Sequence, residues 1–355
     1  MAQSIHSPPA AVIAAFALDP QGIEPLAGGL INRSFLALGQ GRRVVLQQVS
    51  DIFGPRLNED LDAVTRHLAQ RGLVTPRLQT TRDGNLTFYH GNERWRAWRY
   101  IPGVTVDKVS CPEQARTAAR LVARFHAALG DLDHAFQGAR LGVHDTVAHL
   151  RHLADTLDQN TDHPAYPAVA PIARDILTLH GQTPRLPATG ERIVHGDLKI
   201  SNVIFDAGSG EALCLIDLDT VGPMALPLEL GDAMRSWCNP RAEDDARAYF
   251  DLAVFSAAMT GYSEAAGPFI SDTEWRAILP ATRLITLELA ARFAADALVE
   301  TYFGWNPKRF SSASEHNLVR AAGQLKLARS INAQYAAATA VLESAFSPPG
   351  APVAS

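Results

Sequence analysis

Residues 195–205 read His-Gly-Asp-Leu-Lys-Ile-Ser-Asn-Val-Ile-Phe, and residues 216–219 read Ile-Asp-Leu-Asp. Between them, two short apolar runs at Val203–Phe205 and Ala212–Ile216 flank an Asp-Ala-Gly-Ser-Gly turn. Such runs on either side of a Gly-containing turn predict a β-hairpin. This hairpin is the only strand pair that the pattern predicts in the second part of the chain.

Polar side chains gather at the ends of this hairpin. Antiparallel pairing brings the start of the first strand beside the end of the second, so Asn202 and Asp217 are expected to meet. Asp197 lies five residues before Asn202 and can face the same space. Amide and carboxylate oxygens suit Mg²⁺ that carries nucleotide phosphates. A separate carboxylate, Asp197, can accept a proton from an attacking hydroxyl, and Lys199 can reach phosphate oxygens. An acidic turn without a chemical role would account for any one of these residues, but poorly for the full set.

The composition excludes several classes of protein. The chain has 355 residues, of which 47% are hydrophobic and 19% charged, with a net charge of −5. It is therefore not disordered, and it has no general electrostatic reason to bind nucleic acid or an anionic membrane. Three scattered cysteines, Cys111, Cys214 and Cys238, argue against a disulfide framework and favour a cytoplasmic location. The apolar stretch Ala10–Leu18 is too short to span a bilayer, so we expect a surface helix there.

The order of the elements predicts two lobes. The first hundred residues read mainly as strands joined by Gly-containing turns, with one helical stripe at Leu57–Gln70. After Gly103, long helical patterns dominate. We expect an α+β architecture in which a small β-rich lobe at 1–101 precedes a large helical lobe at 102–345. Residues 346–355 are expected to form a flexible tail.

Local signals predict three further features of the helical part. Ser110-Cys-Pro-Glu113 reads as a capping box at the start of the first long helix. Apolar periodicity predicts another helix over Ala242–Met259. His144, His149 and His152 lack the spacing of a metal-binding pair, so they predict a solvated helix face.

The order His195-Gly-Asp-x-x-x-x-Asn202, followed by Asp217, resembles the catalytic and metal motifs of the aminoglycoside phosphotransferase and choline kinase group. That resemblance implies a two-lobed protein-kinase-like fold that binds ATP and Mg²⁺. It implies that Asp197 is the catalytic base, that Asn202 and Asp217 bind Mg²⁺, and that His195 braces the catalytic loop. Lys199 would complete the catalytic set.

One branch of this group, the bacterial N-acetylhexosamine 1-kinases, looks most similar. The resemblance implies transfer of the ATP γ-phosphate to the anomeric hydroxyl of an N-acetylhexosamine, and it covers about residues 23 to 335. The segments that carry it are Ile216-Asp-Leu-Asp-Thr-Val-Gly-Pro223, Leu230-Gly-Asp-Ala-Met-Arg235, Gly28-Gly-Leu-Ile-Asn32, Leu46-Gln-Gln-Val49, Arg292-Phe-Ala-Ala-Asp296 and Asn317-Leu-Val-Arg-Ala-Ala-Gly-Gln324.

A neutral sugar needs directional hydrogen bonds rather than a charged pocket. Asp219 lies two residues after Asp217, so the two side chains would point the same way if the strand continued. For the arginines, an internal salt bridge with Asp232 or Asp296 is as good an explanation as sugar binding. The expected substrate-binding residues are Asn32, Asp219, Arg235 and Arg292.

The nucleotide side departs from the kinase pattern. Kinases carry a Lys on the third strand that holds phosphates and pairs with a helix Glu. Here the corresponding strand, Val44–Val49, contains no Lys or Arg, and Gln48 is the best match, with Glu59 or Asp62 as its helix partner. Adenine would bind backbone groups of the connector after the last strand. The expected nucleotide-binding residues are Gly28, Gly29, Gln48, Arg99, Tyr100 and Ile101.

Three functions remain open. The first is a kinase of an N-acetylhexosamine or related sugar. The second is an aminoglycoside- or choline-type phosphotransferase with an amine-bearing acceptor, which a pocket lined by several carboxylates would favour and Arg235 and Arg292 would oppose. The third is a catalytically silent nucleotide-binding module, which the missing third-strand cation favours.

The expected partner is a small-molecule sugar or amino sugar, bound by a monomer or homodimer. The run Arg94–Arg99 interleaves cations with aromatic residues, as some single-stranded nucleic-acid binders do. As an edge strand that leads into the connector it needs no such role. We therefore expect neither a nucleic acid nor a membrane as a partner.

Overall fold

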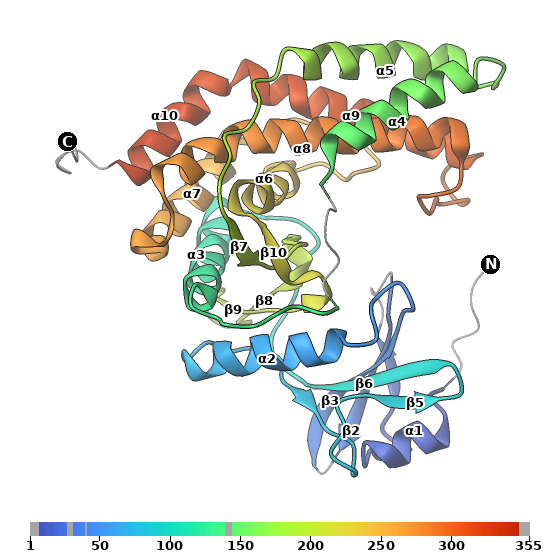
Figure 1. Cartoon of the computed structure of the whole chain (residues 1–355), viewed down its shortest axis with the longest axis vertical. Helices are drawn as coiled ribbons and strands as arrows, with labels where there is room; N and C mark the ends of the chain where they lie inside the picture. The colour runs from blue at the N-terminus through green and yellow to red at the C-terminus, as the bar shows by residue number, and fades with distance from the viewer. Residues whose placement is uncertain (1–6, 27–30, 40, 139–143, 348–355) are drawn as a thin grey trace.

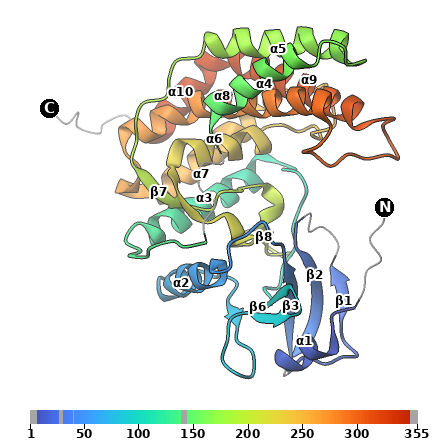
Figure 2. The same ribbon diagram turned by 45° about the vertical axis from the view of Figure 1, so that its right-hand side comes forward.

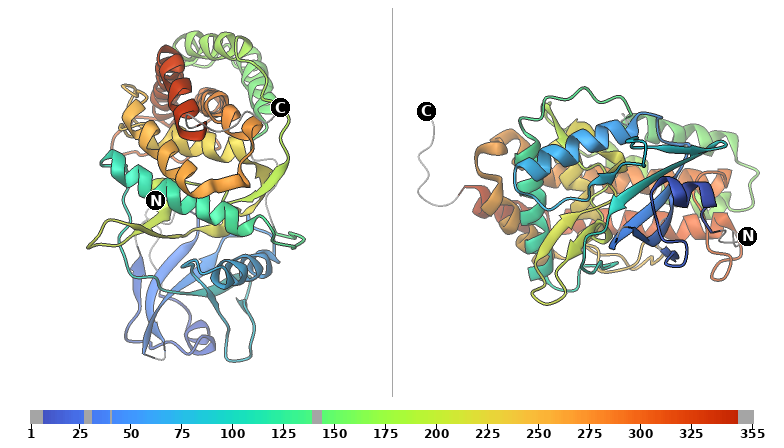
Figure 3. Two further views of the ribbon diagram at one scale, coloured as in Figure 1. Left: turned by 90° about the vertical axis from the view of Figure 1, so that its left-hand side faces the viewer. Right: turned by 90° about the horizontal axis from the view of Figure 1, so that it is seen from below.

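The computed structural model describes residues 7–26, 31–39, 41–138 and 144–347. It has a small lobe built around an antiparallel sheet and a large helical lobe, stacked one above the other (Figures 1 and 3). The α+β two-lobed architecture expected from the sequence is thus confirmed.

The small lobe is an antiparallel sheet with the strand order β1-β2-β3-β6-β4, and β5 also pairs with β6. The run Arg94–Arg99 therefore lies on a central strand and not on the edge strand expected from the sequence. The strands are β1 (Glu24–Leu26), β2 (Arg33–Gly39), β3 (Arg42–Val49), β4 (Leu78–Gln79), β5 (Phe88–His90) and β6 (Glu93–Arg99).

Helices cover both faces of this sheet. Helix α1 (Ala10–Ala15) packs on one face, where Val12 joins the core formed by alternate residues of β2 and β3. The helix lies at the surface, as expected, with Ala10, Ala11 and Ala14 exposed, but it ends at Ala15 rather than at Leu18. Helix α2 (Leu57–Gln70) covers the other face, facing the large lobe (Figure 1). Its predicted apolar stripe, which includes Leu61 and Leu68, is buried, and each such side chain contributes about 1.5–3 kcal/mol.

The large lobe is organised around one long helix, α8. Helices α4, α5, α6 and α9 pack against it, while α3 packs against α7. The helices are α3 (Pro112–Leu129), α4 (Thr146–Gln159), α5 (Tyr166–Gly181), α6 (Leu226–Trp237), α7 (Leu252–Ala266), α8 (Asp272–Val299), α9 (Ala313–Ala333) and α10 (Tyr335–Phe346).

Two helix starts differ from the prediction. Pro112 occupies the first turn of α3, so the N-cap is Cys111, and Ser110 donates to Gln114 instead of forming the expected capping box. Helix α7 begins ten residues later than the start expected from periodicity. Its start is set by Asp251, whose carboxylate accepts the backbone N–H groups of Ala253 and Val254.

Two strand pairs lie between the lobes. The predicted hairpin is present as β8 (Val203–Phe205) and β9 (Ala212–Leu215). A second pair, β7 (Glu191–Val194) with β10 (Gly222–Ala225), was not expected, so the prediction of a single strand pair was wrong. Figure 2 shows β8 at the level where the small lobe meets the helices.

The connector between the lobes is fixed to β8. Val104 and Phe205 exchange both backbone hydrogen bonds, at 2.9 and 2.8 Å. Gly103 precedes this contact with a φ of +150°, and a Cβ there would lie 2.6 Å from the Phe205 carbonyl oxygen. Only glycine fits this close approach.

Candidate active site

The predicted catalytic and metal-binding residues come together at the end of the β8–β9 hairpin. The Asn202 amide donates to the Asp197 carbonyl at 2.8 Å, and the backbone N–H of Ile216 donates to the Asn202 carbonyl at 2.9 Å. Asn202 is therefore held between the catalytic loop and the residue that precedes Asp217. The juxtaposition follows from antiparallel pairing, as the sequence predicted.

His195 is fully buried and binds two parts of the site to each other. Its Nε2 lies 2.9 Å from the Ile216 carbonyl oxygen, and its Nδ1 lies 3.3 Å from the backbone N–H of Asp197. This arrangement requires a neutral ring that donates from Nε2 and accepts at Nδ1. His195 thus positions Asp197 relative to the strand that leads to Asp217.

Glu229, in the first turn of α6, also fixes the loop that contains His195 and Asp197. The sequence analysis did not identify Glu229. Its two carboxylate oxygens accept the backbone N–H groups of His195 and Gly196, each at 2.9 Å. Gly196 has a φ of +85°, and a Cβ there would lie 2.4 Å from the Thr220 carbonyl oxygen. The signal that could have identified Glu229 is its place in the first turn of the helix that follows β10. The sequence analysis did not predict this helix.

Trp237, at the end of α6, provides a further anchor for the catalytic loop. Its indole N–H donates to the Leu198 carbonyl at 2.7 Å. Backbone groups of the loop are therefore hydrogen-bonded on both sides of Asp197, while the Asp197 side chain itself stays partly exposed.

The Asp197 carboxylate and the Lys199 ammonium form an ion pair at the mouth of the site. The two atoms lie 2.8 Å apart, and the side chains are 25% and 52% exposed. Partial burial opposes protonation of Lys199, but Asp197 outweighs it and raises the lysine pKa. The Asp197 carboxylate and the Lys199 ammonium are therefore both accessible here, one beside the other.

Asp217 has the geometry of a constrained site residue. Its φ of 62° and ψ of 52° lie in the left-handed region, which non-glycine residues seldom adopt outside functional sites. The residue is exposed. Partial desolvation, together with the charges of Asp219 and Asp197, raises its pKa. A divalent cation would relieve this unfavourable negative charge.

Asn202 and Asp217 fit a magnesium ion that also binds phosphate and water. Their oxygens are of the hard type that Mg²⁺ prefers, and Mg²⁺ typically takes only one or two protein ligands. In the part of the chain that the structure describes, no group of three His, Cys, Asp or Glu side chains could hold a metal ion. The donor set agrees with a phosphate-bound Mg²⁺ rather than a closed protein site.

Arg235 and Asp232 of α6 form a charge pair. Arg235 donates to Asp232 at 2.7 Å, as expected if the arginine forms an internal salt bridge. Burial raises the pKa of Asp232, but Arg235, His144 and Lys199 outweigh it, and the net effect lowers that pKa. Arg235 therefore lies near Lys199, and its guanidinium already forms an ion pair with Asp232.

Glu288 of α8 anchors the loop before α4. It is buried, and it accepts hydrogen bonds from the His144 ring at 3.1 Å and from the Thr146 hydroxyl at 2.5 Å. The predicted solvated face is therefore wrong for His144, because its side chain is only 11% exposed. Glu288 lies 144 positions after His144 and 142 positions after Thr146 in the sequence, so no local pattern indicated these two hydrogen bonds.

Arg292 lies one turn beyond Glu288 on α8. Its guanidinium donates to the Tyr302 hydroxyl at 2.9 Å and lies 5.3 Å from the centre of that ring. The alternative salt bridge between Arg292 and Asp296 is not formed. Asp296 instead accepts hydrogen bonds from the backbone of residues 301–303 and from Asn317, and it thereby fixes the loop between α8 and α9.

The Asn32 amide of the small lobe donates to the Asp219 carboxylate of the large lobe at 2.6 Å. Asp219 is only 2% exposed and points toward the small lobe, whereas Asp217 is exposed. The expectation that both point the same way fails because β9 ends at Leu215 and residues 218–220 form a 3₁₀ turn. Asp219 therefore lies in an enclosed network rather than in an open pocket.

On the nucleotide side, Gln48 lies on the face of β3 opposite to α2. Its carbonyl oxygen accepts a hydrogen bond from Arg33 at 3.0 Å. Glu59 and Asp62, its expected partners, instead bind arginines of the small lobe. Because side chains alternate along a strand, Gln47 is the residue that faces α2 and the large lobe.

The remaining nucleotide-side predictions concern two glycines and the residues at the end of β6. Gly28 and Gly29 lie outside the described residues. Arg99 ends β6, and the N–H of Tyr100 donates to the Arg43 carbonyl at 3.3 Å, so the connector begins at Ile101.

The chain matches the model of the phosphotransferase enzyme family over residues 22–267, well over half of its length. Within the described residues, no helix is both long enough and apolar enough to cross a membrane.

Three solved kinases and phosphotransferases share the fold. An aminoglycoside phosphotransferase from Alicyclobacillus acidocaldarius is 18% identical, with a TM-score of 0.64, over 94% of this chain and 98% of that one. The amicoumacin kinase hAmiN, in complex with AMP-PNP, Ca²⁺ and Ami, is 14% identical, with a TM-score of 0.61, over 89% and 91%. A microcompartment-associated aminopropanol kinase is 14% identical, with a TM-score of 0.59, over 93% and 97%.

Proposed function

The chain belongs to the phosphotransferase enzyme family, and on that premise we propose that it is an ATP-dependent kinase of a sugar hydroxyl. The acceptor we propose is the anomeric hydroxyl of an N-acetylhexosamine. The solved hAmiN complex holds AMP-PNP and Ca²⁺, which supports a nucleotide and a divalent metal as the cofactors of this fold. We assign Mg²⁺ as the metal here because Asn202 and Asp217 supply the ligands it prefers.

In the proposed reaction, Asp197 and Lys199 are the protein groups that act on the acceptor hydroxyl and on the transferred phosphoryl group. Asp197 accepts the proton of the acceptor hydroxyl as the new O–P bond forms and the bond to the ADP oxygen breaks. Lys199 stabilises the negative charge that spreads over the transferred phosphoryl oxygens. Asn202 and Asp217 would hold Mg²⁺, which would supply positive charge to offset that of the phosphates. His195 and Glu229 keep the loop in place without touching the substrate.

The nucleotide would lie between the lobe of residues 1–101 and the lobe of residues 102–345. Adenine would pair with backbone groups of the connector at Ile101, because the N–H of Tyr100 is already bound to Arg43. Gly28 and Gly29 would contribute the loop over the phosphates. Arg99 would flank the adenine site from the end of β6.

The charge pairing on the acceptor side is the observation that carries the proposal of a neutral acceptor. Asp232 is paired with Arg235, and Glu288 is paired with His144. A site for a polycation would instead present unpaired carboxylates. Paired donors and acceptors suit hydroxyl groups, each of which both donates and accepts a hydrogen bond.

Aromatic side chains beyond this region support a sugar acceptor. Tyr302 and Trp305 lie in the loop between α8 and α9 and are 60% and 39% exposed. Arg292 packs on the Tyr302 ring, one turn along α8 from Glu288. Exposed rings beside a few polar groups are typical of sites that bind the mixed apolar and polar faces of small ligands. Arg292 would then contact the acetamide or a ring hydroxyl.

An amine-bearing acceptor is the second candidate. The solved relatives include an aminoglycoside phosphotransferase and an aminopropanol kinase. In this chain, Glu288 and Asp232 together raise the pKa of His144 against the effect of burial, so the local field favours positive charge. This field is the observation that keeps an amino sugar or amino alcohol open as the acceptor.

We would test the proposal by ³¹P NMR of the purified protein with Mg-ATP and N-acetylglucosamine, N-acetylgalactosamine, or an aminoglycoside. The expected result is a sugar 1-phosphate resonance that is absent with Asp197→Asn. Phosphate on the aminoglycoside alone would overturn the sugar assignment and favour the second candidate. Binding of Mg-ATP without turnover of any acceptor would favour a catalytically silent module.

A further inference from the structure

A buried arginine, Arg96 of β6, lies where the small lobe faces the large lobe. The register of β3 and β6 places Arg96 directly opposite Gln47. Directly opposed residues of an antiparallel pair share one face of the sheet. Arg96 therefore enters the same space between the sheet and α2 as Gln47, although β3 itself has no cation from Val44 to Val49.

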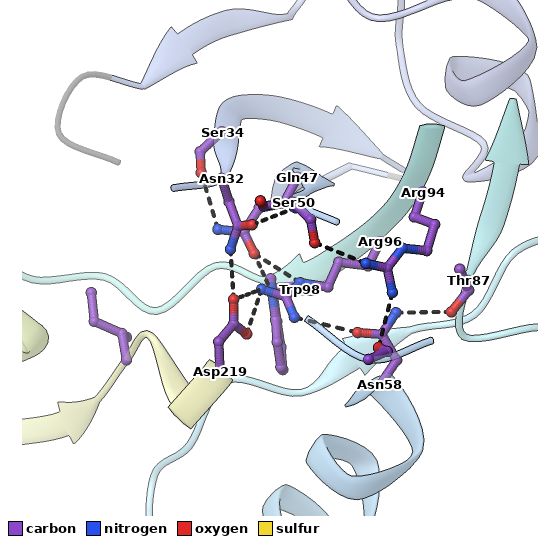
Figure 4. A network of polar contacts seen from close by, with 12 residues as sticks. Asn32, Ser34, Gln47, Ser50, Asn58, Thr87, Arg94, Arg96, Trp98 and Asp219 are labelled. Atoms are coloured by element: carbon purple, nitrogen blue, oxygen red, sulfur yellow. Dashed lines mark hydrogen bonds and ion pairs between the residues drawn. The ribbon is translucent and has the colours of Figure 1, made fainter. Parts of the chain in front are cut away.

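The Arg96 guanidinium is fully engaged by three elements (Figure 4). Its Nε donates to Gln47 Oε1 at 2.9 Å, and its Nη1 donates to Asn58 Oδ1 of α2 at 3.3 Å. Its Nη2 donates to Asp219 Oδ2 at 2.8 Å and lies 2.7 Å from the other oxygen of that carboxylate. The Arg96 and Asp219 side chains are only 1% and 3% exposed.

This ion pair joins the two lobes at the metal-binding loop. Asp219 belongs to the 3₁₀ turn of the large lobe, two residues after Asp217. Gln47, Asn58 and Arg96 all belong to the small lobe, and Asn32 at the start of β2 donates to Asp219 as well, at 2.6 Å. The turn that follows Asp217 is therefore fixed from the small-lobe side by two residues.

We propose that Arg96 is a positioning residue that, through its ion pair with Asp219, holds the Asp217 loop in place for the metal-bound nucleotide. In kinases, a third-strand lysine paired with a helix glutamate connects the strands, the helix and the phosphates. Here Arg96 connects the strands, α2 and the metal loop from a neighbouring strand. The proposal rests on nucleotide binding at Asp217 but not on the identity of the acceptor.

Arg96 acts through Asp219 rather than by touching phosphates. Its guanidinium is enclosed, and its donors are directed at Gln47, Asn58 and Asp219. A buried ion pair is also weak evidence for stability, because the cost of desolvating both charges offsets much of their attraction. Removing both charges together should therefore disturb the fold less than removing either one.

The test compares Arg96→Gln, Asp219→Asn, the double variant and Arg96→Lys. Arg94→Gln is the matched control, because Arg94 lies two residues earlier on β6 and is similarly buried. Its guanidinium donates to backbone carbonyls of Ser50, Phe53 and Gly54 within the small lobe. Arg94→Gln thus removes a buried guanidinium from the same strand without breaking a contact between the lobes.

Two readouts need no acceptor and no turnover. The first is hydrogen exchange of the backbone amides of residues 216–221 in the nucleotide-free protein. The second is the affinity for Mg-AMP-PNP by calorimetry. For the double variant we expect faster exchange in this segment and about a tenfold or greater loss of affinity, as for other residues that orient metal ligands. Its unfolding midpoint should stay closer to that of the wild type than those of the single variants.

Arg96→Lys keeps the charge but cannot make all three hydrogen bonds of the guanidinium. Its affinity for Mg-AMP-PNP should therefore lie between those of Arg96→Gln and the wild type. This variant and the double variant keep the test decisive if a single variant fails to fold. Wild-type affinity for Mg-AMP-PNP in the double variant would overturn the proposal. So would an equal loss of affinity in Arg94→Gln, because the effect would then be general destabilisation. Either result leaves the proposed sugar acceptor untouched, since no acceptor is present.

Discussion

The two sides of the contact between the lobes are built in different ways. In the large lobe, the catalytic groups and their contacts lie close in sequence: Asn202 bonds to a residue five positions away, and His195 to one 21 positions away. On the small-lobe side, Arg96 reaches a partner 123 positions away, and Asn32 reaches one 187 positions away. Short-range contacts leave a recognisable motif, whereas long-range contacts leave none.

The two sides also differ in their exposure to solvent. Asp197 and Lys199 are accessible to solvent, whereas Arg96 and Asp219 are enclosed. Exposure suits groups that must meet a substrate, and enclosure suits groups that fix geometry. The comparison therefore predicts that changes on the catalytic side reduce turnover with little loss of stability, while changes to enclosed groups affect binding or stability.

The largest effect is expected for Asp197→Asn. The variant lacks a general base, so turnover should fall by about 10²–10⁴. The Asp197 backbone carbonyl, which accepts from Asn202, is retained, so the unfolding midpoint and Mg-AMP-PNP affinity should change little. Asp206→Asn, in the exposed hairpin turn, is the control and should keep full turnover. Full turnover in Asp197→Asn would contradict the assignment of Asp197 as the general base. It would also contradict the distinction between exposed reacting groups and enclosed positioning groups.

The next effect is expected for Asp217→Ala. Loss of this carboxylate should lower the affinity for Mg-AMP-PNP by about 10–100-fold, as measured by calorimetry. Affinity for the nucleotide without Mg²⁺ should remain, because the variant loses a metal ligand and not a nucleotide contact. An unchanged dependence on Mg²⁺ would contradict the assignment of Asp217 as a metal ligand.

A smaller effect is expected for Glu229→Gln, which tests whether the large lobe also has an enclosed positioning group. A glutamine can accept from only one of the two N–H groups of His195 and Gly196, so the other is left unpaired. The cost should be about 1–3 kcal/mol in the free energy of unfolding, measured by urea titration. Glu264→Gln, at the surface of the same lobe, should cost less. Equal costs would show that Glu229 has no special role.

The smallest effect is a pH dependence that involves His144. Burial lowers its pKa, but the hydrogen bond to Glu288 and the charge of Asp232 outweigh burial, so the net pKa is raised above 6.5. A group with a raised pKa in the folded state stabilises the protein fully below its unfolded pKa. That contribution is lost as the pH rises through the folded pKa.

The unfolding midpoint of the wild type should therefore decline as the pH rises from 6.5, and His144→Asn should reduce this decline. His152→Asn, at an exposed position of α4, is the control. A wild-type decline that persists in full in His144→Asn would show that another group is responsible.

The sequence alone determined the parts of the protein that depend on local pattern. The apolar runs around the Gly-containing turn predicted β8 and β9, and the pairing rule placed Asn202 beside Asp217. The stripe at Leu57–Gln70 gave both ends of α2 correctly. These features follow from the periods of strands and helices, which any window of the sequence carries.

Only the tertiary structure decided how the enclosed groups are oriented. β9 ends at Leu215 and Asp217 adopts a left-handed conformation, so Asp219 turns toward the small lobe instead of following Asp217. The register of β3 and β6 brings Arg96 opposite Gln47, which no property of β3 itself reveals. The physical reason is the same in both cases. A change of one residue in conformation or register reverses the side-chain direction, and packing between distant segments sets that change.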